Sequence, residues 1–353
     1  MAIALPWYVL VIWANGERFI DAFFGYHNFE RFTSVVNRHW APWYFYFLVV
    51  LVSFIPWSVY LPAAIARLRF WQINHWRQQP RSSHLGLFAL TWFVVIFGFF
   101  TIAVTKLPSY TLPLLPAAAI LVGLFWSDHW TEQMYRSRPD RITTISYIVN
   151  VMLFGALAMA TFYSPNWLGN EPEMPDLPEL MQQAGIIVSS VWIWAGATIA
   201  GILLLCFRRG RWLWLINVVS LIAFILIAAL PTAVIVDVQR QLPLRQLSET
   251  IVQVRQPTEP VVMIGYSKPS VVFYTERSVT FFTDIDQVAD DLQKLASHKR
   301  HRKASSLLLL GRTLKLKETE IPPEKYQAIA RAGVFELVRI QMEDARAGLK
   351  KSQ

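Results

Sequence analysis

The stretch Lys106-Leu-Pro-Ser-Tyr-Thr-Leu-Pro-Leu-Leu-Pro-Ala-Ala-Ala119 separates two apolar runs. The first run covers 85–105 and the second 109–127, so Lys106 and Tyr110 are expected where two membrane helices turn over at a bilayer face. A lysine there is costly to bury unless it reaches the interface or meets an anion, which makes Lys106 a site candidate. The alternative is an anchor whose ammonium group snorkels to the membrane surface.

Prolines interrupt this stretch at three positions, Pro108, Pro113 and Pro116, and each removes a backbone donor. Pro108 also pushes Leu107 away from the helical region. Irregular backbone at membrane depth is tolerated only where protein or a water-filled cavity covers it. We therefore expect a broken or re-entrant backbone at this turn.

The composition is that of a membrane protein. Of the 353 residues, 54 % are hydrophobic, which is too many for an ordinary soluble protein. The formal net charge of +9 lies largely in short loops between apolar runs, where it indicates membrane topology, and no nucleic-acid partner is expected. The single cysteine, Cys206, excludes an intramolecular disulfide.

The apolar runs predict a polytopic α-helical membrane protein. A run over 3–14 is shorter than the roughly 20 apolar residues that a membrane helix needs, so it counts as a partial span. About six full candidates follow, at 43–66, 85–105, 109–127, 142–163, 185–207 and 212–236. The predicted domains are a partial membrane segment with an interfacial loop (1–42), a transmembrane domain (43–236) and a soluble α/β domain (237–353).

Arginines predict the orientation in the cytoplasmic membrane. They gather in the loops at 67–81, 136–141 and 208–211, which the positive-inside rule places in the cytoplasm, whereas the loop at 164–184 has no Lys or Arg. The Lys106 turn, that loop and the C-terminal domain are then expected outside. The acidic side chains of the loop are expected to be simply solvated; they are Glu171, Glu173, Asp176 and Glu179.

The period of the pattern changes after residue 237. Strands are predicted at 260–266, 271–275, 306–310 and 334–340, and helices at 247–254, 285–296 and 322–332. This alternation indicates a small α/β domain with a largely parallel sheet. The segment 265–268 lacks the further glycines of a dinucleotide site, which we therefore reject.

Two blocks of sequence resemble a known family. Lys-Leu-Pro-Ser-Tyr-x-Leu-Pro, followed by small and aliphatic residues, is similar to a motif of the prokaryotic protein-mannosyltransferase and aminoarabinose-transferase (ArnT-like) membrane glycosyltransferases, which have the GT-C fold. The second block agrees and consists of His27-Asn-Phe-Glu-Arg-Phe32, His39-Trp-Ala-Pro-Trp-Tyr-Phe-Tyr46 and Pro56-Trp57. The soluble domain also resembles that family's C-terminal domain, most clearly over 269–279.

This resemblance implies transfer of a sugar from a polyprenyl-phosphate donor to lipid A or to protein hydroxyl groups, outside the cytoplasmic membrane. A phosphate leaving group calls for cations of fixed geometry, for which arginine is the bidentate choice. Arg31 and Lys106 are the candidate phosphate-binding cations, and Tyr110 is a candidate phenolic donor. The apolar helices over 85–104 and 110–126 are expected to hold the isoprenoid tail.

A divalent metal and a general base are the open questions. His27 and Glu30 are candidate metal ligands, because they could share a helix face; the alternative is a hydrogen-bonded loop histidine. The family's catalytic carboxylate lies upstream of the sequence present here, so the catalytic residue is unknown. We therefore expect a C-terminal part of a glycosyltransferase that acts only with its N-terminal half, which is present either in the same chain or as a separately encoded one. The alternative is a non-catalytic lipid-binding or interaction protein, and a transporter is disfavoured because the helices are nearly free of charges.

Overall fold

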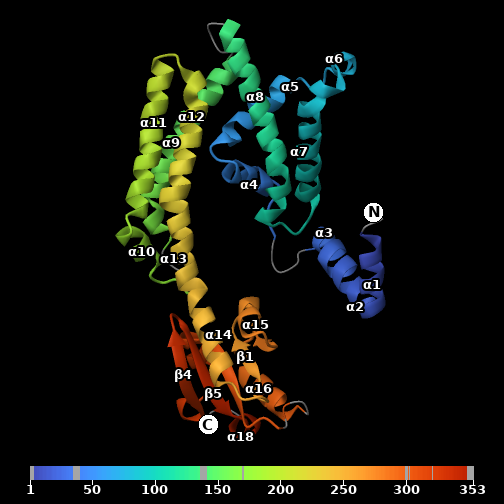
Figure 1. Cartoon of the computed structure of the whole chain (residues 1–353), viewed down its shortest axis with the longest axis vertical. Helices are drawn as coiled ribbons and strands as arrows, with labels where there is room; N and C mark the ends of the chain where they lie inside the picture. The colour runs from blue at the N-terminus through green and yellow to red at the C-terminus, as the bar shows by residue number, and fades with distance from the viewer. Residues whose placement is uncertain are drawn as a thin grey trace. The chain divides into compact units, whose positions relative to one another are not determined.

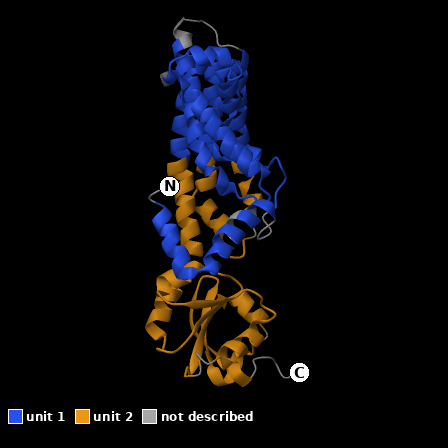
Figure 2. Cartoon of the chain, turned by 90° about the vertical axis from the view of Figure 1, so that its right-hand side faces the viewer, with its two compact units in different colours: residues 1–160, 191–224 blue, residues 161–190, 225–353 orange. Residues whose placement is uncertain are grey.

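The computed structural model describes residues 4–34, 40–135, 141–168, 171–298, 301, 303–319 and 321–347 (Figure 1). The chain forms two compact units, and each is discontinuous in sequence (Figure 2). Unit 1 contains residues 1–160 and 191–224, and unit 2 contains residues 161–190 and 225–353.

Unit 1 is built from helices. A short N-terminal group contains α1 (Leu5–Asn15), α2 (Glu17–Phe19), a π-helical stretch (Ile20–Glu30) and α3 (Arg31–Thr33). The larger group contains α4 (Phe45–Ser53), a 3₁₀ turn (Trp57–Tyr60), α5 (Leu61–Leu68), α6 (Ile73–Gln78), α7 (Leu85–Ile102), a 3₁₀ stretch (Pro108–Leu114), α8 (Leu115–Tyr135), α9 (Arg141–Phe162), α11 (Ile186–Cys206) and α12 (Leu213–Phe224).

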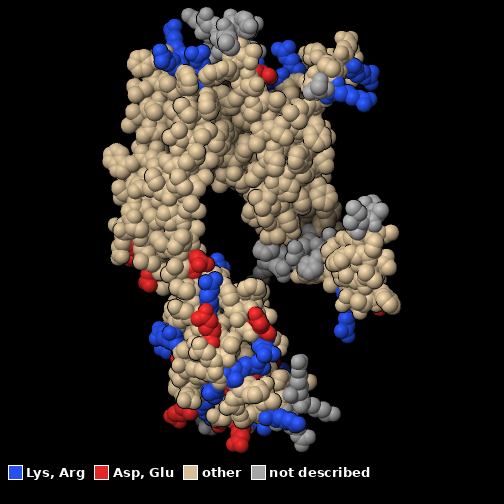
Figure 3. Space-filling model, viewed as in Figure 1, with Lys and Arg blue, Asp and Glu red and all other residues tan. Residues whose placement is uncertain are grey.

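The predicted membrane architecture is confirmed. Within the described residues, five helices are long and apolar enough to cross a membrane, or up to six if a bent pair counts as one span. In Figure 3 the surface over the long helices α7, α8, α11 and α12 is almost free of charged side chains along its length, and Lys and Arg gather at one end of these helices. The chain is therefore a multi-pass membrane protein with a small C-terminal sheet domain.

One predicted span differs from a simple helix. The run at 43–66 divides into α4 and a second helical piece, Trp57–Leu68, with a bend of 115° between them. Pro56 lies at this break and has no backbone N–H to donate, so a straight helix through it would lose a hydrogen bond. The run at 3–14, by contrast, is the short apolar helix α1, as the pattern predicts.

Buried polar side chains join the helices of unit 1. The Tyr60 hydroxyl donates to Oδ1 of Asn150 at 3.0 Å, and the Tyr147 hydroxyl lies 2.6 Å from Nε2 of His129. All four side chains are almost fully buried. Such interhelical hydrogen bonds satisfy polar groups that lipid cannot, and they fix which helices are neighbours.

Unit 2 is a sheet covered by helices and continued by a membrane helix. Its helices are α10 (Leu177–Gln183), α13 (Leu230–Arg240), α14 (Leu242–Val254), α15 (Pro269–Thr275), α16 (Val288–Ser297), α17 (Thr313–Glu318) and α18 (Met342–Ala347). Its strands are β1 (Val261–Ile264), β2 (Val279–Phe282), β3 (Ser306–Arg312), β4 (Tyr326–Ala332) and β5 (Phe335–Gln341), in the order β2-β1-β3-β5-β4.

The two faces of this sheet are covered by different helices. On one face, Leu244, Leu247 and Ile251 of α14 pack against alternate residues of the central strands, such as Met263. On the other face, α16 and α18 pack through residues such as Leu292. The soluble domain is thus three layers, helix, sheet and helix, as Figure 1 shows.

Several details of the predicted α/β domain are wrong. Residues 271–275 form part of helix α15, because Pro269 starts a helical turn and places Val271 and Thr275 together on its buried face. Residues 326–332 form strand β4, where a helix was predicted over 322–332. A tight turn at Gly333, whose φ of 54° suits glycine, pairs this strand with β5.

The sheet is mixed and not largely parallel, since β1 pairs in parallel with β2 and β3 whereas β5 runs antiparallel to β3 and β4. Strand β2 was not predicted.

Candidate functional site

Lys106 lies in the segment between two membrane spans, four residues after the last residue of α7. Its ammonium group donates to the carbonyl oxygens of Thr101 and Ala103, each at 2.7 Å, and lies 5.5 Å from the ring centroid of Tyr46. Only 7 % of the residue is exposed, and this burial lowers the pKa of the ammonium group. Lys106 therefore caps carbonyl groups that the last turn of a helix leaves without partners.

Tyr46 fixes the backbone of the same turn. Its hydroxyl donates to the carbonyl oxygen of Leu107 and accepts from the backbone N–H of Leu107, both at 3.2 Å. The Tyr46 side chain is completely buried. One phenol from α4 thus satisfies both backbone groups of a residue whose neighbour, Pro108, prevents a regular helix.

The segment that carries Arg31 lies against this turn. The backbone N–H of Val104 donates to the carbonyl oxygen of Phe32 at 3.1 Å, and the hydroxyl of Thr105 donates to that of Ser34 at 2.8 Å. The rings of Phe32 and Phe99 lie 5.3 Å apart. The structure therefore brings together two stretches that are about seventy residues apart in sequence. The side chain of Arg31 itself is outside the part of the chain that the structure describes.

Tyr110 lies in the 3₁₀ stretch after the turn. Its ring stacks on Phe100 of α7, with centroids 4.7 Å apart and an interplanar angle of 26°. This stacking fixes the ring, and the phenol remains half-buried. That its hydroxyl donates a hydrogen bond to a lipid phosphate stays a prediction.

The metal site also stays a prediction. The side chain of His27 is not among those described, and Glu30 is exposed on the π-helical stretch. The described residues contain no group of three or more His, Cys, Asp or Glu side chains that could hold a metal ion.

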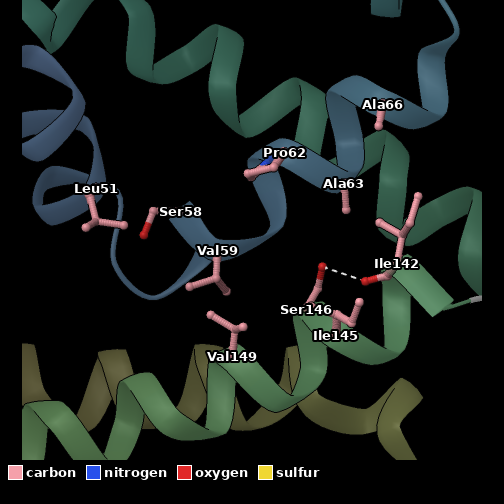
Figure 4. Close-up of a pocket in the computed structure, with 10 residues that line it drawn as sticks. All are labelled: Leu51, Ser58, Val59, Pro62, Ala63, Ala66, Ile142, Ile145, Ser146 and Val149. Carbon is pink, nitrogen blue, oxygen red and sulfur yellow. Dashed lines mark hydrogen bonds between the residues drawn. The ribbon is translucent and has the colours of Figure 1, made fainter. Parts of the chain in front are cut away.

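Unit 1 also carries an apolar groove of about 550 Å³ between α5 and α9 (Figure 4). Aliphatic side chains dominate its lining, and Ser146 turns its hydroxyl back to the carbonyl oxygen of Ile142 at 3.0 Å. The groove is separate from the helices 85–104 and 110–126 that the sequence suggests for an isoprenoid tail.

A second cluster of charges, in unit 2, was missed by the sequence analysis. Glu173 is 4 % exposed and meets Nη2 of Arg312 at 3.0 Å, Nζ of Lys268 at 2.9 Å and Nε of Arg240 at 3.1 Å. The guanidinium of Arg312 also lies 3.9 Å from the ring centroid of Tyr266. The expectation that Glu173 is solvated is therefore wrong.

The ionisation of Glu173 follows from these contacts. Burial alone would raise the pKa of its carboxyl group, but hydrogen bonds and positive charges from Lys268 and Arg312 outweigh it and hold that pKa below the ordinary value. No spacing in the sequence signals this cluster, since its cations lie 67, 95 and 139 residues beyond Glu173. The carboxylate thus attaches the 161–190 segment to the soluble domain within unit 2.

Comparisons with known proteins agree with the family resemblance. Residues 254–353 match the C-terminal domain of cyanobacterial RgtA-type glycosyltransferases. An undecaprenyl phosphate-alpha-4-amino-4-deoxy-L-arabinose arabinosyl transferase of Photorhabdus laumondii is 28 % identical over 222 residues, which is 61 % of this chain and 35 % of that protein. A transferase of the same name from Pseudomonas fluorescens is 31 % identical over 163 residues, 46 % of this chain and 25 % of that protein.

Solved structures share the fold. ArnT from Cupriavidus metallidurans bound to undecaprenyl phosphate superposes with a TM-score of 0.65 at 20 % identity, over 100 % of this chain and 60 % of that chain. Its apo form gives 0.61 at 18 % identity. The chain thus spans about a third or less of the length of these curated relatives and 60 % of the ArnT chain. The resemblance predicted from the sequence is confirmed: over part of their length, this membrane protein is similar in sequence to the ArnT-like glycosyltransferases and shares the fold of ArnT.

Proposed function

We propose that this chain binds a polyprenyl-phosphate-linked sugar and takes part in transferring the sugar to an acceptor, with lipid A as the leading candidate and protein hydroxyl groups as the second. The observation that carries this proposal is the pairing of the Arg31-bearing segment with the Lys106 turn. The relatives named for transfer from undecaprenyl phosphate support the choice of donor.

The Lys106 turn has the chemistry for a phosphate. An ammonium group has three N–H donors, and Lys106 gives two of them to Thr101 and Ala103. A phosphate oxygen would take the third and would restore the charge that burial disfavours. Arg31 would add bidentate hydrogen bonds from the adjacent segment, and Tyr110 a phenolic one.

The proposal also includes the side of the membrane on which the site lies and the source of the general base. The basic loops favour a site and a C-terminal domain on the outer side of the cytoplasmic membrane. A glycosyl transfer also needs a carboxylate within reach of the acceptor. We propose that this carboxylate comes from outside the turn described here.

The test is binding of undecaprenyl phosphate, the lipid-phosphate part of the donor, by the purified chain in lipid nanodiscs. Undecaprenyl phosphate binding, measured by native mass spectrometry, should fall by about tenfold or more in Lys106→Met, because a charge-assisted hydrogen bond is lost. Lys106→Arg should retain much of the binding. Lys294→Met is the matched control, since Lys294 is an exposed lysine of α16. Unchanged binding in Lys106→Met would refute the proposal.

The second candidate function is lipid binding without catalysis, because the Lys106 turn offers an ammonium group for a phosphate whether or not a transfer follows. A transfer assay with a polyprenyl-phosphate-linked sugar and lipid A separates the two. Turnover by the chain, alone or with a partner half, supports the enzyme, whereas donor binding without turnover in either case supports the binding protein.

A further inference from the structure

The three cations around Glu173 carry more charge than it neutralises. Arg240, Lys268 and Arg312 meet one carboxylate, so this cation cluster holds two positive charges in excess. Arg312 is 8 % exposed, and its Nε has no hydrogen-bond partner among the described residues. Arg240 is 47 % exposed, so the cluster is open on that side. An excess of buried and half-buried cations attracts an anion.

The chain itself sets the depth of this cluster relative to a bilayer. Residues 225–236 are apolar and helical, and Asp237 is the first charged residue after them. Arg240 lies three residues further on, or about 4.5 Å along the helix. The polar layer on each side of the hydrocarbon core is about 5–7 Å thick. Arg240, and the carboxylate that it shares with the other two cations, therefore lie at the depth of lipid phosphates.

Two exposed apolar side chains accompany the cluster. Lys268 is followed directly by α15, which carries Phe273, and Arg312 is followed directly by α17, which carries Leu314. Phe273 is 78 % exposed and Leu314 69 %, more than any other large apolar side chain described after residue 240. Within unit 2, α15 lies at the end of the soluble domain from which α13 departs (Figure 1). Cations beside exposed aromatic and aliphatic side chains are typical of surfaces that contact a membrane.

We propose that this face of the soluble domain rests on the bilayer. The cation cluster binds the phosphate groups of anionic lipids, and Phe273 and Leu314 enter the region between head groups and acyl chains. Glu173 positions the three cations, because it accepts hydrogen bonds from Lys268 and Arg312 and forms an ion pair with Arg240. This inference goes beyond the transferase function, because it concerns ordinary membrane lipids and a surface distinct from the Lys106 turn.

The experiment uses the full chain in nanodiscs. Cys206 is the single cysteine, so Cys206→Ser permits one environment-sensitive fluorophore at Phe273→Cys, at Leu314→Cys or, as a control, at Gln327→Cys on exposed β4. Quenching by lipids that carry a spin label near the head group should be at least about twofold stronger at 273 and 314 than at 327. It should increase when phosphatidylglycerol is added to phosphatidylcholine.

The cations are tested in the same background. Arg240→Gln should abolish the increase caused by phosphatidylglycerol, whereas Arg331→Gln, which removes an exposed arginine of β4, should retain it. Equal quenching at 273, 314 and 327 would overturn the proposal and would leave a protein partner as the occupant of this face. Quenching that ignores phosphatidylglycerol, or that Arg240→Gln leaves unchanged, would overturn the role of the cation cluster.

Discussion

Nη2 of Arg312 lies 3.0 Å from Oε1 of Glu173, although 139 residues separate them in sequence and both side chains are less than a tenth exposed. This contact joins strand β3 of the sheet to the loop that precedes α10. A buried ion pair is costly to break, because removing one partner leaves the other charge buried without compensation. Replacing the carboxylate of Glu173 should therefore lower the stability of unit 2 strongly.

Glu173→Gln should lower the stability of unit 2 by about 3–5 kcal/mol, since Arg312 and Lys268 would keep their charges without the carboxylate. Thermal unfolding in detergent, followed by circular dichroism, measures the change. Glu171→Gln is the matched control in the same loop, and it should have almost no effect because Glu171 is exposed. Similar melting of the two variants would contradict the importance of the buried pair.

The same carboxylate predicts a dependence on pH. Its pKa in the folded protein is lower than the ordinary value of 4.5, so its contribution to stability is complete above about pH 4.5. That contribution is lost as the pH falls through the folded pKa and the carboxylate takes up a proton. The difference in melting temperature between wild type and Glu173→Gln should accordingly be large at pH 7 and shrink in acid. A difference independent of pH would mean that packing, and not charge, is lost in the variant.

Tyr46→Phe should loosen the turn that carries Lys106. The variant keeps the buried ring but removes the hydroxyl that serves both backbone groups of Leu107, and leaving such groups without partners costs about 1–3 kcal/mol. Hydrogen exchange at residue 107 should become faster, and donor binding should weaken. Tyr44→Phe, which alters an exposed neighbour, is the control and should change neither.

Tyr110→Phe tests the phenol separately from its ring. Phenylalanine can keep the stacking on Phe100, so the fold should be unaffected and undecaprenyl phosphate binding should fall by roughly fivefold to tenfold, as for one lost hydrogen bond. Native mass spectrometry of donor complexes gives the ratio. Full binding by this variant would remove Tyr110 from the proposed site.

Leu247→Ala on α14 should destabilise the soluble domain by about 2–5 kcal/mol, because its side chain is 1 % exposed and packs on the sheet. Val252→Ala on the same helix should cost less than about 0.5 kcal/mol, because Val252 is 59 % exposed. The rate of proteolysis of the soluble domain in detergent measures both changes. Equal susceptibility of the two variants would argue against the packing of α14 on the sheet.

Apolar length predicted the membrane helices correctly, since a run of about 20 apolar residues has few other stable placements. It did not predict the bend of 115° near Pro56, because several turns of apolar sequence on both sides of a proline fit a straight or a bent helix equally well. In the soluble domain, the strands buried on both faces, β1 and β3, were predicted from their aliphatic runs. The edge strand β4 was not, because its sequence suits a helix and its pairing with β5 overrides that preference.

The residues of the candidate site were likewise predictable only in part. Lys106 and Tyr110 were chosen because a charged and a phenolic group at a membrane turn are conspicuous in an apolar sequence. Tyr46 was noticed only as one aromatic residue among many, since nothing local indicates that its hydroxyl reaches Leu107. Glu173 was predicted to be solvated, because the cations that surround it become its neighbours only when the sheet has formed.

Helix α14 continues the helix that carries the last membrane span, with a single residue between α13 and α14, and it also packs on one face of the sheet of the soluble domain, through Leu244, Leu247 and Ile251. Membrane insertion of the last span and folding of the soluble domain are therefore coupled. If the last span fails to insert, α14 cannot be delivered in its native direction, and the aliphatic face of the sheet stays open to chaperones and proteases. Correct insertion of the last span is thus a condition for burying the aliphatic face of the sheet.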